Sequence, residues 1–550
     1  MRFSNNSFWF LFLIFLFGCN SNETSLKQWN PYDETIELEM NSNHPIKRMQ
    51  FKSIQSNFND KNNWFIPFKN ELISFTLEDH DRLKPFILEQ DIPSIQNLIS
   101  EGNLTYEALT LFYLFRIYYF EMQQGTYLNS IVSLNPKVLE QAREKDSNKN
   151  QDLDHPLYGM PILLKDNINA LPMATTAGAA VFQKNIPQQD AFIVGQLKAK
   201  GALILGKANM SEWAYYFCQG CPVGYSAIGG QTLNPYGRKQ FETGGSSSGS
   251  GVAVAANFAV AAIGSETSGS ILSPSAKNSV VGLKPTIGAV SRSGIVPISS
   301  TLDTAGPMTK FVIDNAILMS ALIGKDERDP YSYKSTPIQF EALNNVSLKG
   351  KRLGLIRRFQ SDSLMRIAII KMENAGAEVI YYDPPNIELK KFRKLLDVDM
   401  KVDLPSYIKN YGSTKLDVYS VKDIVDFNLK DSLLYAPYGQ GIFTRISKDT
   451  ISRIYFEPYK NELMRAATEY FQEAIQNYQL DAILSIDNFT ASFAAAAHYP
   501  AIGVPMGYLK NGQPQNITFI APSRQEQLLL ELGAAFEKLT KHRKIPKLFK

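Results

Sequence analysis

Two clusters rich in glycine and serine, residues 244–251 and 265–270, hold the residues of this chain that are best suited to chemistry. A small apolar segment, rich in alanine and valine, separates them. Flexible linkers have a similar composition, but a linker has no reason to enclose a segment that is ready for burial. Buried turns of glycine and serine bring backbone N–H groups and hydroxyls close to a ligand, as acyl transfer requires. We therefore interpret the two clusters as parts of a catalytic site.

A lysine is the candidate base for these hydroxyls. Lys165 follows the apolar run Pro161–Leu164 and precedes the polar residues Asp166 and Asn167. In the simplest interpretation, Lys165 caps the end of a strand and pairs with Asp166. An apolar environment lowers the pKa of a lysine, however, and a neutral lysine can act as a general base toward a serine. The neighbours of Lys165 in the fold must decide between the two interpretations.

The elements that must position these residues follow a repeated pattern. Amphipathic helical stretches precede several short apolar runs, which is typical of a layered α/β fold. Thr105 is a candidate N-cap for a mostly buried helix that continues to Phe120. Residues 388–450 are less regular, and we interpret them as an inserted region that shapes a site. The expected strands are Pro161–Leu164, Leu203–Leu205, Ala259–Ile263, Arg352–Ile356, Val379–Tyr382 and Ala482–Ile486, and the expected helices include Ile193–Lys200, Met365–Ala375 and Tyr459–Tyr478.

Composition excludes several classes of function. The chain has 550 residues, 44% of them hydrophobic and 20% charged, which is ordinary for a globular protein. A net charge of +4 with dispersed lysines and arginines argues against a nucleic-acid surface. The five histidines are far apart in sequence, so a zinc site or a Ser-His-Asp triad has little support. We expect neither a metal nor a cofactor.

The N-terminus predicts a targeting segment. Arg2 supplies positive charge, and the apolar run Phe8–Phe17 is too short to span a bilayer. Gly18 and Cys19 follow directly, in a pattern that resembles a bacterial lipobox. The alternative is an ordinary secretory signal with an incidental cysteine. We expect lipidation at Cys19, which would anchor the protein to a bacterial membrane in the cell envelope, on its periplasmic or cell-surface side.

These observations divide the chain into three parts. Residues 1–18 are interpreted as a lipoprotein signal peptide and residues 19–74 as a tether or N-terminal extension. Residues 75–550 are interpreted as the catalytic domain. Within it, Cys218 and Cys221 make a C-x-x-C pair that we interpret as structural, either as a local disulfide or as two packed thiols.

The chain resembles the amidase signature family of serine hydrolases from about residue 90 to about residue 545. This resemblance implies one large α/β domain, in which helices cover both faces of a mixed central β-sheet. The similar segments are GMPILLKDNI (159–168), TTAG (175–178), GALILGKANMSEW (201–213), GGQTLNPYG (229–237), GGSSSGSG (244–251), GSETSGSILSP (264–274), GLKPTIGAVSRSGIVPIS (282–299), DTAGPM (303–308) and YPAIGVPMG (499–507).

The resemblance also implies a Ser-Ser-Lys triad. Ser270 matches the family's nucleophile, Ser246 its bridging serine and Lys165 its base. In the family the bridging serine follows a cis peptide bond, which would here join Gly245 to Ser246. The backbone N–H groups of one turn would form the oxyanion hole. That turn consists of Thr267, Ser268, Gly269 and Ser270.

Three residues depart from the family pattern. Many members carry aspartate at the position of Glu266, glycine at that of Ser268 and arginine at that of Leu272. Without the arginine, Glu266 needs another partner, which the sequence does not reveal. The endings of the central motifs look like those of the peptide amidase branch.

We expect an amidase that converts a small-molecule or peptide amide into an acid plus ammonia or an amine. One alternative is a transamidase that resembles glutamyl-tRNA amidotransferase and feeds ammonia to a tRNA-bound substrate. The export signal and the lack of a basic surface argue against it. Another alternative is a catalytically silent amidase fold that binds a partner at the cell surface. The intact set of Lys165, Ser246 and Ser270 argues against that interpretation.

Overall fold

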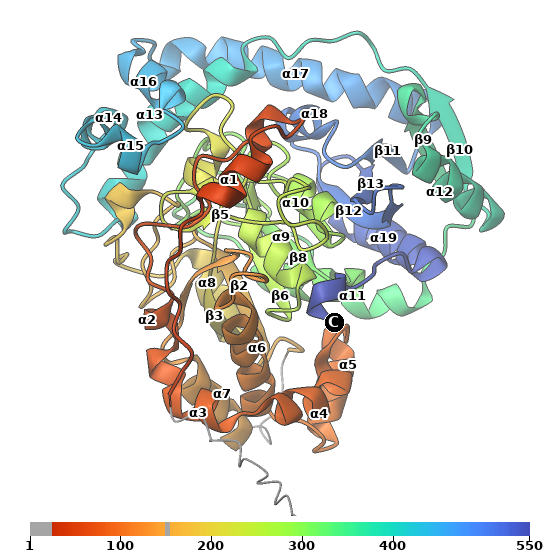
Figure 1. The fold of residues 1–550 in the computed structure, drawn as a ribbon. Helices are drawn as coiled ribbons and strands as arrows, with labels where there is room; N and C mark the ends of the chain where they lie inside the picture. The colour runs from red at the N-terminus through yellow and green to blue at the C-terminus, as the bar shows by residue number, and fades with distance from the viewer. Residues whose placement is uncertain (1–24, 149–154) are drawn as a thin grey trace, which may run out of the picture.

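The computed structural model describes residues 25–148 and 155–550, which build a layered α/β fold around one large sheet (Figure 1). The expected lipidation site, Cys19, lies outside the described residues. The sheet has 11 strands in the order β1-β3-β2-β6-β8-β7-β12-β13-β11-β9-β10. In chain order they are β1 (Ile131–Leu134), β2 (Pro161–Lys165), β3 (Leu203–Ala208), β6 (Ala261–Glu266), β7 (Val281–Lys284), β8 (Thr304–Thr309), β9 (Arg352–Ile356), β10 (Glu378–Tyr382), β11 (Ala482–Ile486), β12 (Ala501–Tyr508) and β13 (Pro514–Ile520).

The sheet is mixed, as expected. β2 runs parallel to both of its neighbours, β3 and β6, and at the far end β9 runs parallel to β10 and β11. The pairs between these ends, from β6–β8 to β11–β13, are antiparallel. A separate two-stranded ribbon pairs β4 (Tyr225–Ser226) with β5 (Gly230–Gln231). Every strand expected from an apolar run is present. Most of these strands are buried, and strands buried on both faces read as continuous apolar sequence, whereas β10 at the end of the sheet is largely exposed or half-buried.

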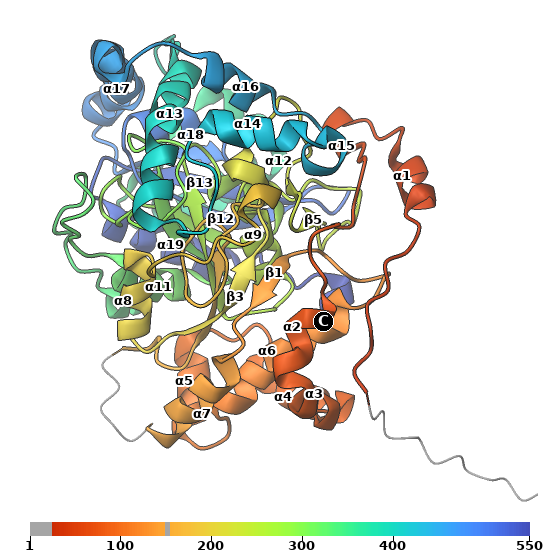
Figure 2. The same ribbon diagram turned by 90° about the vertical axis from the view of Figure 1, so that its left-hand side faces the viewer.

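Helices cover the sheet on both faces (Figures 1 and 2). Thr105 caps α6 as expected, since its side chain accepts a hydrogen bond from the N–H of Ala108. Outside residues 25–74 and 388–450, the α-helices of the described residues are α4 (Leu77–Ile87), α5 (Ile92–Ser100), α6 (Tyr106–Glu121), α7 (Val138–Ser147), α8 (Phe192–Ala199), α9 (Ser248–Ala255), α10 (Leu272–Lys277), α11 (Val312–Leu322), α12 (Ser363–Asn374), α17 (Arg453–Tyr478), α18 (Ala491–Ala496) and α19 (Glu526–Thr540).

The segment between the two glycine/serine clusters forms helix α9 and then strand β6, all of it buried. Glycine is required in α9 because the helix packs directly on backbone. A Cβ atom at Gly249 would lie 2.4 Å from the carbonyl oxygen of Ser130 and 2.5 Å from backbone atoms of Asn209. This close approach of α9 to the sheet brings the two clusters to the same end of the sheet.

Residues 25–74, which the sequence led us to interpret as a tether or N-terminal extension, pack along the side of the fold. The segment runs up to α1 (Thr35–Asn41) and returns to α2 (Asn62–Phe65) and α3 (Lys69–Ser74) (Figure 2). Ile54 is fully buried, and its carbonyl oxygen accepts a hydrogen bond of 2.8 Å from the N–H of Gln231. Isolated aromatic and aliphatic side chains of this segment are buried against the fold. Because they have no periodic spacing, the sequence pattern did not predict that the segment packs on the domain.

Residues 388–450 are also more regular than expected. They form α13 (Phe392–Tyr411), α14 (Val421–Leu429), α15 (Ser432–Tyr435) and α16 (Gly441–Lys448). Apolar side chains of α13, α14 and α16 build a second hydrophobic core together with Phe182, Trp213 and Phe217 of the main fold. Pro405 lies inside α13, and proline and polar residues weaken the helical pattern in sequence. The Tyr407 hydroxyl donates a hydrogen bond of 2.6 Å to Asn169, close to the end of β2. This region therefore lies beside the candidate site, where it was expected. Among the described residues, no helix has the length and apolar character to span a membrane.

Candidate active site

Lys165 lies at the carboxyl end of β2 with its side chain fully buried. Its Nζ atom is 2.8 Å from Ser246 Oγ, 2.9 Å from Ser265 Oγ and 3.0 Å from the carbonyl oxygen of Ser265. The fold thus brings the expected base into contact with one serine of each glycine/serine cluster.

Burial sets the proton affinity of this lysine. Loss of solvation lowers the pKa of Lys165 to about 7, while the carboxylates of Asp303 and Glu266 act in the opposite direction. A substantial fraction of Lys165 is therefore neutral near pH 7. A neutral amine can donate its two N–H bonds to Ser265 and accept a proton from the Ser246 hydroxyl through its lone pair.

The pairing of Lys165 with Asp166, which was the simplest interpretation of the sequence, does not form. Asp166 instead pairs with the buried ammonium of Lys207 at 3.2 Å, and it accepts a hydrogen bond from the Thr176 hydroxyl. Lys207 comes from β3, the neighbouring parallel strand, where its backbone pairs with that of Leu164. The carboxylate next in sequence is thus neutralised by another lysine, and Lys165 is left for the serines.

Ser246 is fully buried and follows a cis peptide bond from Gly245. Glycine is needed at position 245 because a Cβ atom there would lie 2.6 Å from Ser211 Oγ and 2.7 Å from a methyl group of Val223. The carbonyl oxygen of Ser246 accepts a hydrogen bond of 3.0 Å from the N–H of Ser211. Close packing on both sides holds this turn beneath Lys165.

The second cluster is tied to the first through backbone contacts. The N–H of Ser247 donates a hydrogen bond of 3.2 Å to the carbonyl oxygen of Ser270. The Ser247 hydroxyl also donates to the carbonyl oxygen of Ser265 at 3.0 Å. Ser270, the expected nucleophile, is 8% exposed, whereas Ser246 and Lys165 are 0% exposed. Ser270 is therefore the member of the set that solvent, and hence a substrate, can reach.

The turn from Thr267 to Ser270 presents backbone N–H groups. Those of Ser268, Gly269 and Ser270 donate no hydrogen bond to any residue in the described parts of the chain. Gly269 has a φ of +89°, and a Cβ atom there would lie 2.8 Å from the side-chain nitrogen of Asn488. The Thr267 hydroxyl donates to Asp303 at 2.5 Å, which anchors the start of the turn. Free donors in a fixed turn are what an oxyanion hole requires.

Glu266 finds its partner in the backbone. One of its carboxylate oxygens accepts hydrogen bonds from the N–H groups of Ile271 and Leu272, at 2.7 and 3.0 Å. The side chain of Leu272 is buried in the hydrophobic core. Glu266 thus holds the backbone of the residues that follow Ser270 in place without the arginine that many family members carry at position 272.

Three residues of the site had no role assigned from sequence. They are Ser265, which accepts from Lys165; Asn167, whose amide donates to Ser265 Oγ at 2.9 Å; and Asp303, which anchors Thr267. All three lie inside the segments that resemble the family, and this was the only indication in the sequence that they could belong to the site. Nothing in their spacing indicated which atoms they would contact.

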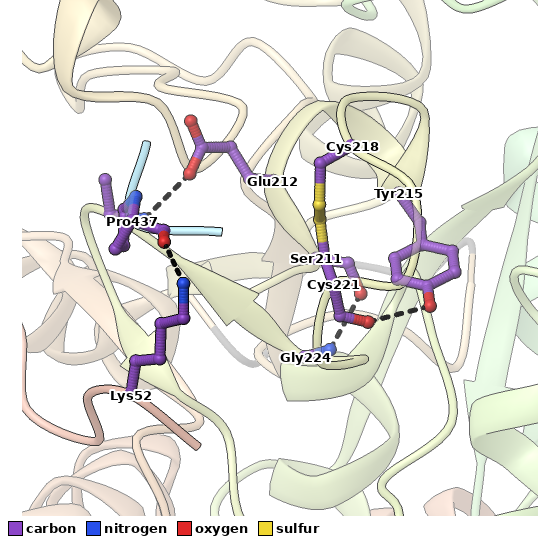
Figure 3. Close-up of a disulfide and its surroundings, with 9 residues drawn as sticks. Lys52, Ser211, Glu212, Tyr215, Cys218, Cys221, Gly224 and Pro437 are labelled. Atoms are coloured by element: carbon purple, nitrogen blue, oxygen red, sulfur yellow. Dashed lines mark hydrogen bonds between the residues drawn. A yellow bond between two sulfur atoms is a disulfide. The ribbon is translucent and has the colours of Figure 1, made fainter. Parts of the chain in front are cut away.

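Cys218 and Cys221 are joined by a disulfide in a loop next to Ser211 (Figure 3). The hydroxyl of Tyr215 donates to the carbonyl oxygen of Cys221 at 2.9 Å. Ser211, whose N–H contacts Ser246, accepts a hydrogen bond of 2.9 Å from the N–H of Gly224 just beyond the loop. The disulfide thus closes a loop that supports the Ser246 turn from outside, in keeping with a structural role.

Comparisons with known proteins agree on one family. The family model for amidases matches residues 111–422. The chain is 34% identical to a probable amidase of Arabidopsis thaliana over 84% of this chain and 92% of the relative. An amidase family protein from Bacillus anthracis str. Ames has a similar structure, with a TM-score of 0.85 and 37% identity over 90% of this chain and 99% of that one. The native peptide amidase from Stenotrophomonas maltophilia has a TM-score of 0.79 and 36% identity over 84% of this chain and 98% of that one.

The large mixed sheet, with a lysine–serine cluster at the carboxyl ends of its interior strands β2 and β6, defines an α/β protein of the amidase type. The chain belongs to the amidase signature family of hydrolases.

Proposed function

We propose that the protein hydrolyses linear carboxylic amides, peptide amides among them, through an acyl-enzyme on Ser270. The observation that carries the proposal is the buried contact of 2.8 Å between Lys165 Nζ and Ser246 Oγ, together with a lysine pKa near 7. A serine that is in contact with a neutral amine can pass on a proton, whereas an isolated serine cannot. The likeness to a peptide amidase supports the substrate class.

In the proposed reaction, protons move along a chain of three side chains. Neutral Lys165 takes the hydroxyl proton of Ser246, and Ser246 takes that of Ser270 as Ser270 Oγ forms a bond to the amide carbon. The carbonyl oxygen becomes an oxyanion, which accepts hydrogen bonds from the N–H groups of residues 267–270.

The same chain of side chains runs in reverse to release the product. Collapse of the tetrahedral intermediate breaks the carbon–nitrogen bond, and the proton held by Lys165 returns through Ser246 to the leaving amine or ammonia. Water then attacks the acyl-enzyme and gives its proton to the same path. The acid leaves and the Ser270 hydroxyl is restored. Each cycle consumes one amide and one water, so no cofactor takes part in the balance.

A fluorophosphonate probe tests the nucleophile. We expect the wild type to take up a single covalent label and Ser270→Ala to take up none, as read by intact-protein mass spectrometry. Ser273→Ala is the matched control, because Ser273 is in the same short segment and its hydroxyl makes no hydrogen bond in the described structure. Labelling that survives in Ser270→Ala contradicts the assignment. An unlabelled wild type that turns over no amide favours a silent fold that serves as a binding protein.

We also propose that Cys19 is lipidated and anchors the protein to a bacterial membrane in the cell envelope. Its support is the run Phe8–Phe17 followed by Gly18 and Cys19. Labelled palmitate should enter the wild-type protein and not Cys19→Ala in a bacterial host. Incorporation that persists in the variant contradicts this proposal.

A further inference from the structure

A wide cavity of about 620 Å³ opens between the start of α13, α16 and α18. Its wall is formed by the start of α13, by Arg445 of α16 and by Ser492 of α18. This volume is in the range of pockets that hold small organic ligands. The cavity is therefore large enough for the body of an amide substrate.

One residue of the cavity wall, Ser492, contacts the turn that carries Ser270. The Ser492 hydroxyl lies 3.0 Å from that of Ser268, two residues before Ser270. On the same side, a Cβ atom at Gly269 would lie 3.4 Å from the Cβ atom of Ala491, at the start of α18. The cavity wall thus contacts the turn through Ser492, so a substrate whose amide lies at the turn can extend its acyl part toward the cavity.

Four cationic side chains line the cavity, and two of them are already neutralised. Arg445 makes two hydrogen bonds to Asp397, of 2.9 and 2.8 Å. Lys394 pairs with Asp449. The Tyr216 hydroxyl also lies 2.7 Å from Asp397, so the lone pairs of this carboxylate are well occupied.

The other two cations, Lys391 and Arg393, are exposed at the start of α13. Neither forms an ion pair with a carboxylate in the described parts of the chain. Lys391 lies over the ring of Tyr459, with its ammonium nitrogen 3.1 Å from the ring centroid. This contact positions the ammonium group but does not neutralise its positive charge, because the ring has no net charge. The main-chain oxygen of Arg393 lies 2.8 Å from the Tyr216 hydroxyl, and this contact fixes the backbone there. The cavity therefore has two positive charges without a counterion.

From this we propose that the enzyme prefers amides whose acyl part carries a carboxylate, and that Arg393 and Lys391 bind it. The inference rests on the proposed function. When the leaving group is ammonia, the amide nitrogen carries no further substituent. The enzyme can then distinguish such substrates only through contacts to the acyl part. A guanidinium matches the two oxygens of a carboxylate, and a pocket lined by one sign of charge concentrates ligands of the opposite sign.

A matched substrate series tests this preference. The series consists of the monoamide of a dicarboxylic acid, its methyl ester and an isostere with an ammonium group in place of the carboxylate. We expect kcat/KM to be at least about tenfold higher for the anionic amide than for the ester, and lowest for the cation. Arg393→Gln should lower kcat/KM for the anionic amide about five- to tenfold, mainly through KM, and leave the ester unchanged. Arg366→Gln, an exposed arginine on α12, is the control and should change neither.

Binding is measured separately from turnover by calorimetry on Ser270→Ala. This variant should bind the anionic amide more tightly than the ester, and Arg393→Gln in the same background should reduce the difference about five- to tenfold. Equal turnover and equal binding of the anionic amide and the ester overturn the inference while leaving the amidase proposal intact. The reverse outcome is that Ser270→Ala binds the anionic amide more tightly than the ester while the wild type hydrolyses neither. It supports the cavity's selectivity and contradicts the proposed hydrolysis.

Discussion

Ser265 accepts two hydrogen bonds from Lys165, one on its hydroxyl and one on its carbonyl oxygen, at 2.9 and 3.0 Å. Two N–H bonds of the amine are thereby directed at β6, and the third position faces Ser246. A side chain with four rotatable bonds is thus held in one orientation inside the fold. This arrangement lets a lysine point a lone pair at one chosen hydroxyl.

Removal of the amine should abolish turnover without unfolding the protein. Lys165→Met keeps most of the buried volume and loses the base, so we expect kcat/KM to fall by about 10²–10⁴-fold. Kinetics on any turned-over amide, together with circular dichroism, will measure both effects. A folded Lys165→Met with near wild-type kcat/KM would contradict the proposed base.

The pH profile should report the same amine. Because burial lowers the pKa of Lys165 to about 7, the protonated form dominates below that pH and cannot accept a proton from Ser246. We expect kcat/KM to rise with pH through about 7 and to level off above it. A profile measured in constant-ionic-strength buffers checks this expectation. If kcat/KM stays constant from well below pH 7 to well above it, Lys165 is not the base that limits the reaction.

Ser265→Ala should keep the Lys165 amine in the site but weaken the hydrogen bonds that orient it. The substitution removes one acceptor for Lys165 and the acceptor for the Asn167 amide, so two buried donors lose a partner. We expect kcat to fall about tenfold and the free energy of unfolding to drop by about 1–3 kcal/mol. Ser250→Ala is the control, because its hydroxyl donates to the carbonyl oxygen of Ile263 away from Lys165. Kinetics and urea unfolding of both variants separate the two roles, and equal kcat values for the two variants would refute the positioning role.

A methyl group at Gly269 should distort the oxyanion turn. Its φ of +89° disfavours an L side chain, and the new Cβ atom would lie 2.8 Å from the Asn488 side-chain nitrogen. We expect Gly269→Ala to lose about 1–3 kcal/mol of stability and to lower kcat more than KM. Gly125→Ala serves as the control, since no atom lies within 4 Å of the added Cβ. Should both variants behave like wild type, the turn would not have the proposed role.

Much of this architecture could be predicted from the sequence because local patterns encode it. Strands β9 and β11 coincide with the runs Arg352–Ile356 and Ala482–Ile486, and Thr105 caps its helix as predicted. Apolar runs and N-caps depend on residues close in sequence, so they can be read without the fold. Family-like motifs likewise located Lys165, Ser246 and the turn before Ser270.

The pairings inside the site were decided by the tertiary structure. Asp166 lies next to Lys165 in sequence, yet it pairs with Lys207 from another strand, and Glu266 binds the backbone of residues 271 and 272. The same holds for the N-terminal segment, whose Ile54 contacts Gln231. Such contacts join residues distant along the chain and depend on strand order and on side-chain direction at the strand ends. The sequence by itself determined which residues could do the chemistry, and only the fold determined which of them meet, because burial and neighbours set both the pKa of Lys165 and the direction of its lone pair.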